Sequence, residues 1–423
     1  MLAAAPATAA AKPRLGLSRG AAEADQRIGL AGHGFPRAAR LRVVLGGETV
    51  KRARTGPRGG FRLRIRVPAL RPGRYRLTVR ARGRGATLIF RIRAGTVAQP
   101  QPAPLTPAPQ SQAPVTAPPP PPPDPPKLVA AGDIACAPSR PESDTECRQR
   151  LTAELVEDID PDAVAALGDL QYPGGELEFF EDSYDPTWGR FKSITHPAVG
   201  NHEYEGDPER DSAPGYYTYF GTAAGDPSEG YYRWSLGDWT VFVLNSGAID
   251  YTLTGGGSAE PDDCWPVSCA AGSDQETWLR DELETLPDDA CVLAYWHHPR
   301  YSSGYGGAHR DYDETAAMYQ ALHEHGAELL LVGHAHNYER FVPMDAAGAV
   351  DPVTGITEFV VGTGGRSLFP NPGPDRDTSA QLYTDAFGVQ ELTLEPDGWS
   401  SRFVTESGEE RDPVTGDCHT PPA

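Results

Sequence analysis

Side chains of the kinds that bind metals follow five hydrophobic runs of the sequence. Each run ends in a glycine or an aromatic residue, and a carboxylate, phenol, amide or imidazole comes next. The five segments are Gly132-Asp133, Gly168-Asp169-Leu170-Gln171-Tyr172, Gly200-Asn201-His202-Glu203, Trp296-His297-His298-Pro299 and Gly333-His334-Ala335-His336. Singly each segment is weak, because Gly-Asp is a common turn and Asn-His can simply close a loop. Together the five segments indicate a set of ligands for metal cations.

The runs before these segments have the length and composition of buried strands, and helical patterns lie between them. Strands are predicted over 127–131, 163–167, 241–245, 292–296, 329–332 and 358–361. Helices are predicted over 146–158, over 274–286 with Ser273 and Glu276 as a capping box, and over 314–325, which Gly326 ends. Functional groups of α/β sheets gather just beyond the carboxyl ends of strands. The pattern therefore predicts a layered α/β domain with one crevice where the five segments converge.

The charge of the chain is divided unevenly along its length. Residues 1–96 carry 22 Lys and Arg against three acidic residues, a net charge of +19, so the remainder carries −39 of the total of −20. A basic module thus precedes an acidic one, and each needs its own interpretation. The acidic part is expected to repel nucleic acid and to suit a site that concentrates divalent cations.

Two segments flank the basic module. Residues 1–13 are Ala-rich and resemble the end of an export signal without its basic start, and a disordered start of a cytosolic protein is the alternative. Residues 14–96 contain short runs of alternating apolar and polar residues between Gly and Pro turns, which predict a small antiparallel sandwich. Residues 97–126 contain 14 Pro and form a linker. No apolar run reaches 18 residues, so no membrane span is predicted.

The six cysteines are even in number and favour disulfides. Cys136/Cys147 and Cys264/Cys269 are close pairs in loop-like sequence, and Cys291 pairs with Cys418 by elimination only. Disulfides persist in oxidising compartments, so the chain is expected to be secreted or to lie at the cell surface.

The five segments, in their order, resemble the pattern of calcineurin-like metallophosphoesterases over residues 127–410, with 411–423 as a tail. Tyr172 and the run from Gly333 to Arg340 resemble the purple acid phosphatase branch of that family. The resemblance implies a four-layer α/β/β/α sandwich of two mixed sheets with two metals at the sheet edge. Residues 14–96 weakly resemble a bacterial immunoglobulin-like module, whose basic faces are expected to hold an anionic wall polymer or surface. A merely solvated face is the alternative.

By position, the resemblance implies two ligand sets that share one carboxylate. They are Asp133, Asp169, Tyr172 and His336 for the first metal, and Asp169, Asn201, His297 and His334 for the second. Two cations about 3.5 to 4 Å apart need shared negative charge between them, which Asp169 would supply. A phenolate with carboxylates suits Fe³⁺ at the first site, and an amide with imidazoles suits Zn²⁺, Mn²⁺ or Fe²⁺ at the second. Successive strand residues point to opposite faces, so only one of His297 and His298 enters the site, and the His-x-Pro alignment selects His297.

Three further residues are candidates for contact with a substrate. His202, beside Asn201, is expected to protonate the leaving group or to contact phosphate, and bracing the loop is its alternative role. Plant members carry a His pair after the His-x-Pro motif, whereas this chain has a Gly-rich segment with His309 and Arg310. His309 is a candidate for one substrate contact and Arg310 for a phosphate fork, although a histidine in such a loop is as often only solvated.

The sequence therefore predicts a secreted, dinuclear, purple acid phosphatase-like enzyme that hydrolyses phosphate monoesters through a metal-activated hydroxide. A phosphodiesterase or nucleotidase with the same centre is one alternative. A non-catalytic surface-binding protein is another, against which stands the complete ligand set. The sequence has neither a phosphate-cradling Gly-rich loop nor a Gly-x-Ser-x-Gly elbow, so it does not support nucleotide-driven or serine-hydrolase chemistry.

Overall fold

The chain divides into two compact units, Met1–Pro122 and Pro123–Ala423. The computed structural model describes residues 13–18, 21–23, 26–45, 48–68, 73–81, 84–93, 124–207, 210–249, 264–287, 289–304, 311–369 and 376–422. In this described part, no helix has the length and apolar character needed to cross a membrane.

The N-terminal unit is built from two β-sheets. One sheet has the order β1-β3-β6, from Arg14–Leu17, Arg27–His33 and Phe61–Arg66. The other has the order β2-β8-β7-β4-β5, from Ala21–Glu23, Arg84–Arg93, Gly73–Ala81, Arg40–Leu45 and Glu48–Arg54. Neighbouring strands are antiparallel except β2 and β8. Alternate residues such as Leu41, Val43 and Leu45 are buried in one core, which confirms the predicted small all-β domain.

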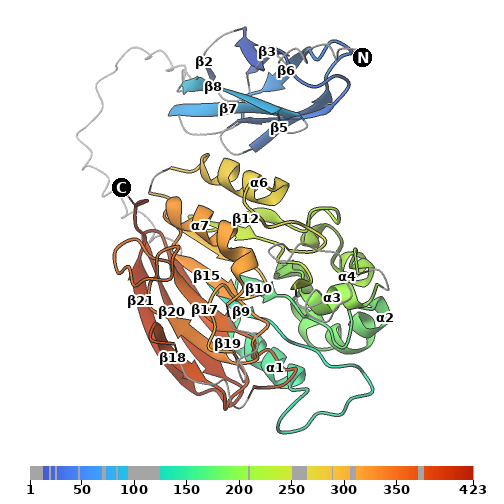
Figure 1. Cartoon of the computed structure of the whole chain (residues 1–423), viewed down its shortest axis with the longest axis vertical. Coiled ribbons are helices and arrows are strands. Elements are labelled where there is room, and N and C mark those ends of the chain that lie inside the picture. Colours follow the sequence, from blue (N-terminus) through green and yellow to red (C-terminus); the bar gives the residue numbers. More distant parts are fainter. Residues whose placement is uncertain are drawn as a thin grey trace, which may run out of the picture. The chain divides into compact units, whose positions relative to one another are not determined.

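The second unit contains two mixed sheets (Figure 1). The six-stranded sheet has the order β11 (Thr195–Ala198), β10 (Ala163–Leu167), β9 (Lys127–Ala131), β19 (Gly388–Glu395), β20 (Gly398–Thr405) and β21 (Glu410–Asp417). The seven-stranded sheet has the order β12 (Tyr232–Leu236), β13 (Trp239–Val243), β14 (Val292–Tyr295), β15 (Leu329–Val332), β17 (Thr357–Val361), β16 (Tyr338–Phe341) and β18 (Ser379–Tyr383). Strands β9 to β11 run parallel in the first sheet, and β13, β14, β15 and β17 run parallel in the second.

Helices and short helical turns connect these strands. They are α1 (Gln149–Ile159), α2 (Leu177–Phe179), α3 (Asn201–Glu205), α4 (Pro214–Phe220), α6 (Asp274–Leu283) and α7 (Ala316–Glu324), with turns η1 (Phe180–Tyr184), η2 (Trp188–Ile194), η3 (Gly221–Ala224) and η4 (Asp313–Thr315). The predicted cap of α6 is present, since Ser273 Oγ accepts the backbone N–H of Glu276 at 3.2 Å. The Glu276 carboxylate accepts the N–H of Gly272, one residue before the expected partner.

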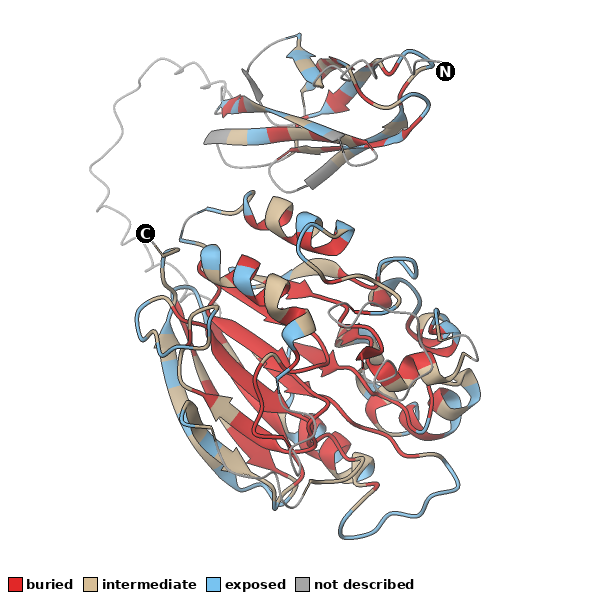
Figure 2. Ribbon diagram, viewed as in Figure 1, coloured by how far each residue is buried: buried red, intermediate tan, exposed pale blue. Residues whose placement is uncertain are grey.

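Both faces of the seven-stranded sheet are buried along its central strands β14, β15 and β17 (Figure 2). Leu329 and Leu331 of β15 belong to the core that the two sheets share. Leu330 and Val332 belong to a second core with residues of α6 and α7, so these helices cover the outer face of this sheet. The layered α/β fold of two mixed sheets predicted from the sequence is confirmed.

Strand positions agree with the predictions more closely than helix ends. Strand β9 matches its prediction, whereas β13 begins and ends two residues before the predicted 241–245. Helix α6 ends at Leu283 rather than at 286, and the predicted helix 314–325 is divided into the 3₁₀ turn η4 and α7.

The six cysteines form the three predicted disulfides. Cys136–Cys147 closes the loop between β9 and α1, and Cys264–Cys269 closes a short loop before α6. Cys291–Cys418 joins the start of β14 to the segment after β21. The last pair therefore links the seven-stranded sheet covalently to the end of the six-stranded sheet.

Candidate metal centre

The predicted ligands lie just beyond the carboxyl ends of parallel strands in both sheets. Asp133 follows β9, Asp169 follows β10 and His334 follows β15. These three residues have left-handed backbone conformations, with φ of 58°, 52° and 66°. Such conformations cost free energy in residues other than glycine and cluster at functional sites. The strand ends thus turn sharply, and their side chains meet at the edge that the sheets share.

The first cluster of donor atoms surrounds the hydroxyl of Tyr172. It lies 2.7 Å from Asp133 Oδ1, 2.9 Å from Asp169 Oδ2 and 3.1 Å from His336 Nε2. His336 Nε2 is also 3.1 Å from Asp133 Oδ1. Two carboxylates, a phenol and an imidazole therefore converge.

The second cluster surrounds His297 Nε2. This nitrogen lies 3.2 Å from Asp169 Oδ2 and 3.1 Å from Asn201 Oδ1. His334 Nδ1 is 3.1 Å from Asn201 Oδ1 and 3.2 Å from His297 Nε2. Asp169 Oδ2 takes part in both clusters, so one carboxylate lies between the two sets.

The chemistry of these donors fits two cations. Asp133 and Asp169 are 0% and 1% exposed, and buried carboxylates this close together need positive charge nearby. Burial opposes ionisation of Asp133, but His336 outweighs it and keeps the pKa of the carboxyl below its ordinary value. Burial and the two carboxylates raise the pKa of Tyr172 well above its ordinary value, so without metal the phenol donates a hydrogen bond. The oxygen and nitrogen atoms that contact one another in each cluster could instead all face a cation bound among them.

Neighbouring groups fix the orientation of the ligands. His297 Nδ1 lies 2.9 Å from the carbonyl oxygen of Leu167, and His336 Nδ1 lies 2.9 Å from Ser367 Oγ. His334 Nε2 lies 2.6 Å from the hydroxyl of Tyr312. Such partners hold the ring of a ligating histidine and select its tautomer. Sequence reasoning did not identify Ser367 or Tyr312, because neither belongs to a ligand motif.

The carboxylate of Glu203 links the loop that carries Asp169 to the loop that carries Asn201. Its carboxylate accepts the backbone N–H groups of Asp169 at 2.9 Å, Leu170 at 2.8 Å and Gly200 at 2.7 Å. Gly200 allows this approach, since a Cβ there would collide with the backbone nitrogen of Asp169. Burial raises the pKa of Glu203 to about 7, with Asp169 as the second cause. The loops that carry Asp169 and Asn201 are therefore fixed relative to each other.

The two adjacent histidines after β14 have different surroundings. His297 belongs to the second donor set, whereas His298 Nδ1 lies 2.9 Å from Ser246 Oγ. The ring of His298 lies 4.5 Å from the ring of His334, measured between centroids. The nitrogens of His297, His298 and His334 lie within 4.8 Å of one another, so His298 borders the second cluster and backs its imidazoles.

His202 lies at the rim of the first cluster. Its ring is 4.2 Å from the Tyr172 ring, and its Nε2 is 3.8 Å from Asp169 Oδ2. Its Nδ1 lies 2.6 Å from the carbonyl oxygen of Pro173 and 3.0 Å from Glu205 Oε2. Burial alone lowers the pKa of His202, but Asp169 and Glu205 outweigh it and raise the pKa to about 10. Without metal, the imidazole of His202 is therefore in its doubly protonated, cationic form at neutral pH.

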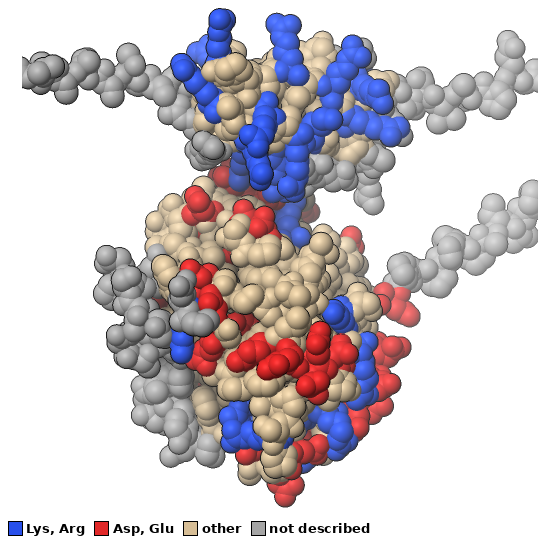
Figure 3. Space-filling view, turned by 90° about the vertical axis from the view of Figure 1, so that its right-hand side faces the viewer, with Lys and Arg blue, Asp and Glu red and all other residues tan. Residues whose placement is uncertain are grey.

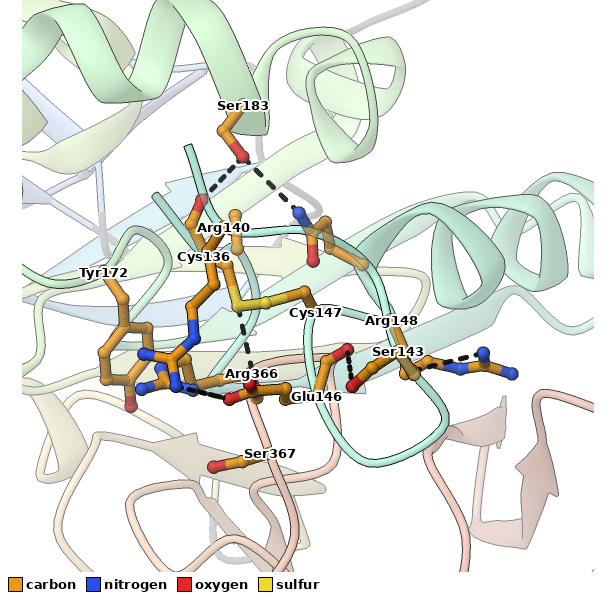
Figure 4. Close-up of a disulfide and its surroundings, with 12 residues drawn as sticks. Cys136, Arg140, Ser143, Glu146, Cys147, Arg148, Tyr172, Ser183, Arg366 and Ser367 are labelled. Carbon is orange, nitrogen blue, oxygen red and sulfur yellow. Dashed lines mark hydrogen bonds and ion pairs between the residues drawn. A yellow bond between two sulfur atoms is a disulfide. The ribbon is translucent and has the colours of Figure 1, made fainter. Parts of the chain in front are cut away.

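Arg366 also borders the site, and sequence reasoning missed it. Its guanidinium carbon lies 5.2 Å from the centre of the Tyr172 ring, and its Nη1 lies 3.2 Å from Glu146 Oε2. Glu146 also pairs with Arg140 at 2.7 Å. Figure 4 shows this group beside the Cys136–Cys147 disulfide, whose loop carries Glu146.

The backbone of Arg366 is held as firmly as its side chain. Its N–H donates to the carbonyl oxygen of Asp133 at 2.9 Å, and its own carbonyl accepts the N–H of Cys147 at 3.2 Å. The guanidinium of Arg366 is thus held beside Tyr172 of the first donor cluster. The predicted substrate residues His309 and Arg310 lie outside the described residues.

The calcineurin-like phosphoesterase family profile matches residues 126–338, about half of the chain. Two relatives from Arabidopsis thaliana are similar to it. Purple acid phosphatase 15 is 25% identical over 210 residues, which are 43% of this chain and 36% of that protein. Probable purple acid phosphatase 20 is 26% identical over 276 residues, which are 58% of this chain and 56% of that protein. The match thus spans about a third to just over half of these relatives' length.

A solved structure shares the fold at lower sequence identity. A purple acid phosphatase named PPD1 from yellow lupin (Lupinus luteus) seeds matches with a TM-score of 0.55 and 17% identity. The match covers 96% of this chain and 74% of that one. The chain belongs to the calcineurin-like phosphoesterase family. Both Arabidopsis relatives and the lupin structure bear the name purple acid phosphatase, the branch that the sequence motifs resemble.

Proposed function

We propose that this protein hydrolyses phosphate monoesters at a dinuclear centre. The observation that carries the proposal is the position of Asp169, whose Oδ2 contacts both Tyr172 and His297. One carboxylate between two donor sets is what a pair of cations about 3.5 to 4 Å apart requires. A protein that only binds a surface would have no need for this arrangement.

The proposed ligands are those that the family motifs select. They are Asp133, Asp169, Tyr172 and His336 for a first cation, Fe³⁺, and Asp169, Asn201, His297 and His334 for a second, Zn²⁺, Mn²⁺ or Fe²⁺. Phenol and carboxylate oxygens favour a hard trivalent ion, and nitrogen donors favour a divalent ion. When bound, such cations lower the pKa of a water and polarise the phosphoryl group.

The chain's own side chains bind the substrate and supply a proton. The guanidinium of Arg366 is placed to hold a phosphate oxygen beside the first cluster, because Glu146 and the disulfide loop fix it there. His202 is placed to donate a proton from Nε2 to the leaving alkoxide, since its Nδ1 is held by Pro173 and Glu205.

Three measurements on the purified protein test the proposal. Metal analysis should find two cations per chain, one of them iron, and a visible absorption band from a Tyr172–iron pair should accompany them. p-Nitrophenyl phosphate should be hydrolysed faster than its bis ester. A colourless, iron-free protein with full activity would refute the Fe³⁺ assignment, and faster turnover of the bis ester would favour the phosphodiesterase or nucleotidase alternative.

The role of His202 has its own test. His202→Ala should slow turnover of poor leaving groups by about 10²-fold or more, and that of p-nitrophenyl phosphate much less. His33→Ala removes an exposed histidine of β3 in the other unit and serves as the control. Equal losses for good and poor leaving groups would argue against proton donation.

We also propose that the protein functions outside the reducing cytosol. All six cysteines are paired, two of the pairs closing short loops, and such bonds persist in oxidising compartments. Thiol titration of protein isolated without reductant should find no free thiol. Six titratable thiols in that sample would remove the support for secretion.

A further inference from the structure

Two arginines share one carboxylate oxygen beside the first donor cluster. Nη2 of Arg140 lies 2.7 Å from Glu146 Oε2, and Nη1 of Arg366 lies 3.2 Å from the same oxygen. Among the described residues, Glu146 supplies the only carboxylate within ion-pair distance of either guanidinium. One carboxylate neutralises one of these two cations, so Arg140 and Arg366, the arginine pair, keep one unit of positive charge.

The neighbouring arginines of the same segment are neutralised more completely. Arg148 lies 2.9 Å from Glu406 and 3.7 Å from Glu142. Arg150 lies 3.0 Å from Glu142 and 2.7 Å from Glu154. Each of these two arginines contacts two carboxylates, whereas the arginine pair has one carboxylate for two cations. The excess positive charge is therefore confined to the side of the segment that borders the candidate metal centre.

This positive charge stands against an acidic background. Residues 97–423 carry a net charge of −39, and Figure 3 shows acidic side chains spread over one face of the second unit. Such a surface repels a substrate that carries more than one negative group. A positive charge at the rim of the site offsets that repulsion at the place where such a substrate would bind.

The backbone holds the arginine pair in place from two sides (Figure 4). The N–H of Arg140 donates to the carbonyl oxygen of Ala137 at 2.9 Å, inside the loop that the first disulfide closes. Glu146 forms an isolated antiparallel bridge with Ser367, the residue after Arg366. Groups that are held in place before binding lose less conformational entropy when a ligand binds.

We infer that the site accepts phosphate monoesters that carry a second anionic group, and that Arg140 binds this second group. The inference rests on the phosphatase function proposed above and names a substrate class for it. The guanidinium carbon of Arg366 lies 5.2 Å from the centre of the Tyr172 ring, so Arg366 is the member of the pair beside the metal ligands. The side chain of Arg140 is 47% exposed against 20% for Arg366, so Arg140 extends the site toward solvent. A guanidinium binds carboxylate or phosphate through two parallel hydrogen bonds.

Two aryl phosphates that differ by one negative charge test the inference on the metal-loaded, full-length protein. 3-Carboxyphenyl phosphate carries a second anionic group and phenyl phosphate lacks it, and each has a single phosphate to hydrolyse. The measured quantity is the ratio of their kcat/KM values, carboxylated ester over plain ester. Arg140→Gln should lower this ratio about three- to tenfold through a higher KM for the carboxylated ester, because one charge-assisted contact is lost at a partly exposed position.

Arg150 offers a matched control, since its side chain is also 47% exposed and also lies 2.7 Å from a glutamate. Arg150→Gln removes the same charge and should change the ratio by less than about 1.5-fold. Arg140→Lys keeps the charge without the fork and should recover part of the loss. Arg366→Gln should raise KM for both esters alike, because the phosphate that it contacts is common to them. An unchanged ratio in Arg140→Gln, or an equal change in Arg150→Gln, would overturn the inference.

Binding of two phosphonates that the protein cannot hydrolyse separates this inference from the proposed activity. Calorimetry on the metal-loaded protein compares 3-carboxyphenylphosphonate with phenylphosphonate. Arg140→Gln should weaken binding of the carboxylated compound about three- to tenfold and that of the plain compound by less than about 1.5-fold. If wild type hydrolyses neither ester, the proposed function fails, and this comparison still decides the role of Arg140. Equal affinities of wild type and Arg140→Gln for the carboxylated compound would overturn the inference whether or not the protein is a phosphatase.

Discussion

The two units of the chain handle charge in opposite ways. The N-terminal unit carries exposed arginines on its sheets, among them Arg40, Arg42 and Arg52. The second unit contains buried carboxylates, which accept hydrogen bonds from N–H and O–H groups of the same unit. Glu203 accepts several backbone N–H groups, and Glu339 accepts the N–H and hydroxyl of Ser303. Exposed charge is solvated by water, whereas buried charge needs its partners within the fold.

The largest effect is expected where buried charge serves the metals. Asp169→Asn removes the carboxylate that contacts both donor clusters. Turnover of p-nitrophenyl phosphate should fall by about 10³-fold or more, and metal content should fall from two cations toward one. Asp158→Asn removes an equal charge from the exposed face of α1 and should change neither. An Asp169→Asn protein with two cations and ordinary turnover would contradict the metal-centre assignment.

A smaller effect is expected at Arg366, where a half-buried charge borders the site. Arg366→Gln should raise KM about tenfold while kcat changes little, because the lost interaction holds substrate rather than the reacting water. Arg366→Lys should recover part of the loss. Arg190→Gln breaks an exposed ion pair with Glu157 and is the control. A fall in kcat at unchanged KM would show that Arg366 does not act through substrate binding.

Buried charge in the second unit should also make the stability of the fold depend on pH, and Glu358 is the residue that tests this. It is buried on β17, and Tyr301 donates its N–H to Oε1 at 3.1 Å, while Oε2 has no hydrogen-bond partner among the described residues. Burial raises its pKa from 4.5 to about 8. The unfolded chain therefore releases this proton first as pH rises, so the stability that the group contributes is complete below about 4.5 and is lost toward pH 8.

Glu358→Gln should remove that pH dependence. Relative to wild type, the variant should gain about 1 to 3 kcal/mol in urea unfolding on going from pH 4.5 to pH 8.5. Glu395→Gln changes an exposed glutamate at the end of β19 and should leave the dependence intact. Parallel stability curves for wild type and Glu358→Gln would show that Glu358 is not held neutral in the folded state.

The smallest effect is expected on separating the units. Pro126 belongs to the second unit, since its carbonyl oxygen accepts the N–H of Leu394 at 2.9 Å. Deletion of residues 1–122 should therefore leave kcat for p-nitrophenyl phosphate within about twofold. Lost phosphatase activity in a folded second unit would show that the two units share the site.

The fold and the segments that carry the candidate donors were predictable because each depends on a local pattern. Strands such as β9 and β15 are short apolar runs, and the ligand motifs follow them directly. Arg366 was not predictable, since its role arises from contact with Glu146, 220 residues away in the sequence. Nothing in its own segment marks it as different from other surface arginines.

The residues that orient the candidate histidine ligands were not predicted, for a related reason. Tyr312 and Ser367 gain their roles only through the direction in which His334 and His336 turn their second ring nitrogens. Helix ends were also predicted less well than strands. The stretch predicted as one helix from 314 begins with a 3₁₀ turn, where the Thr315 hydroxyl donates to the carbonyl of Tyr312.

The bond between Cys291 and Cys418 spans 127 positions and encloses the loops that carry His297, His334, His336 and Arg366. If a protease cuts the backbone once anywhere inside this span, the disulfide still joins the two fragments covalently. Such a nicked molecule would migrate intact in gels until a thiol reductant is added. Damage by a protease would thus leave both halves of the metal site attached to each other.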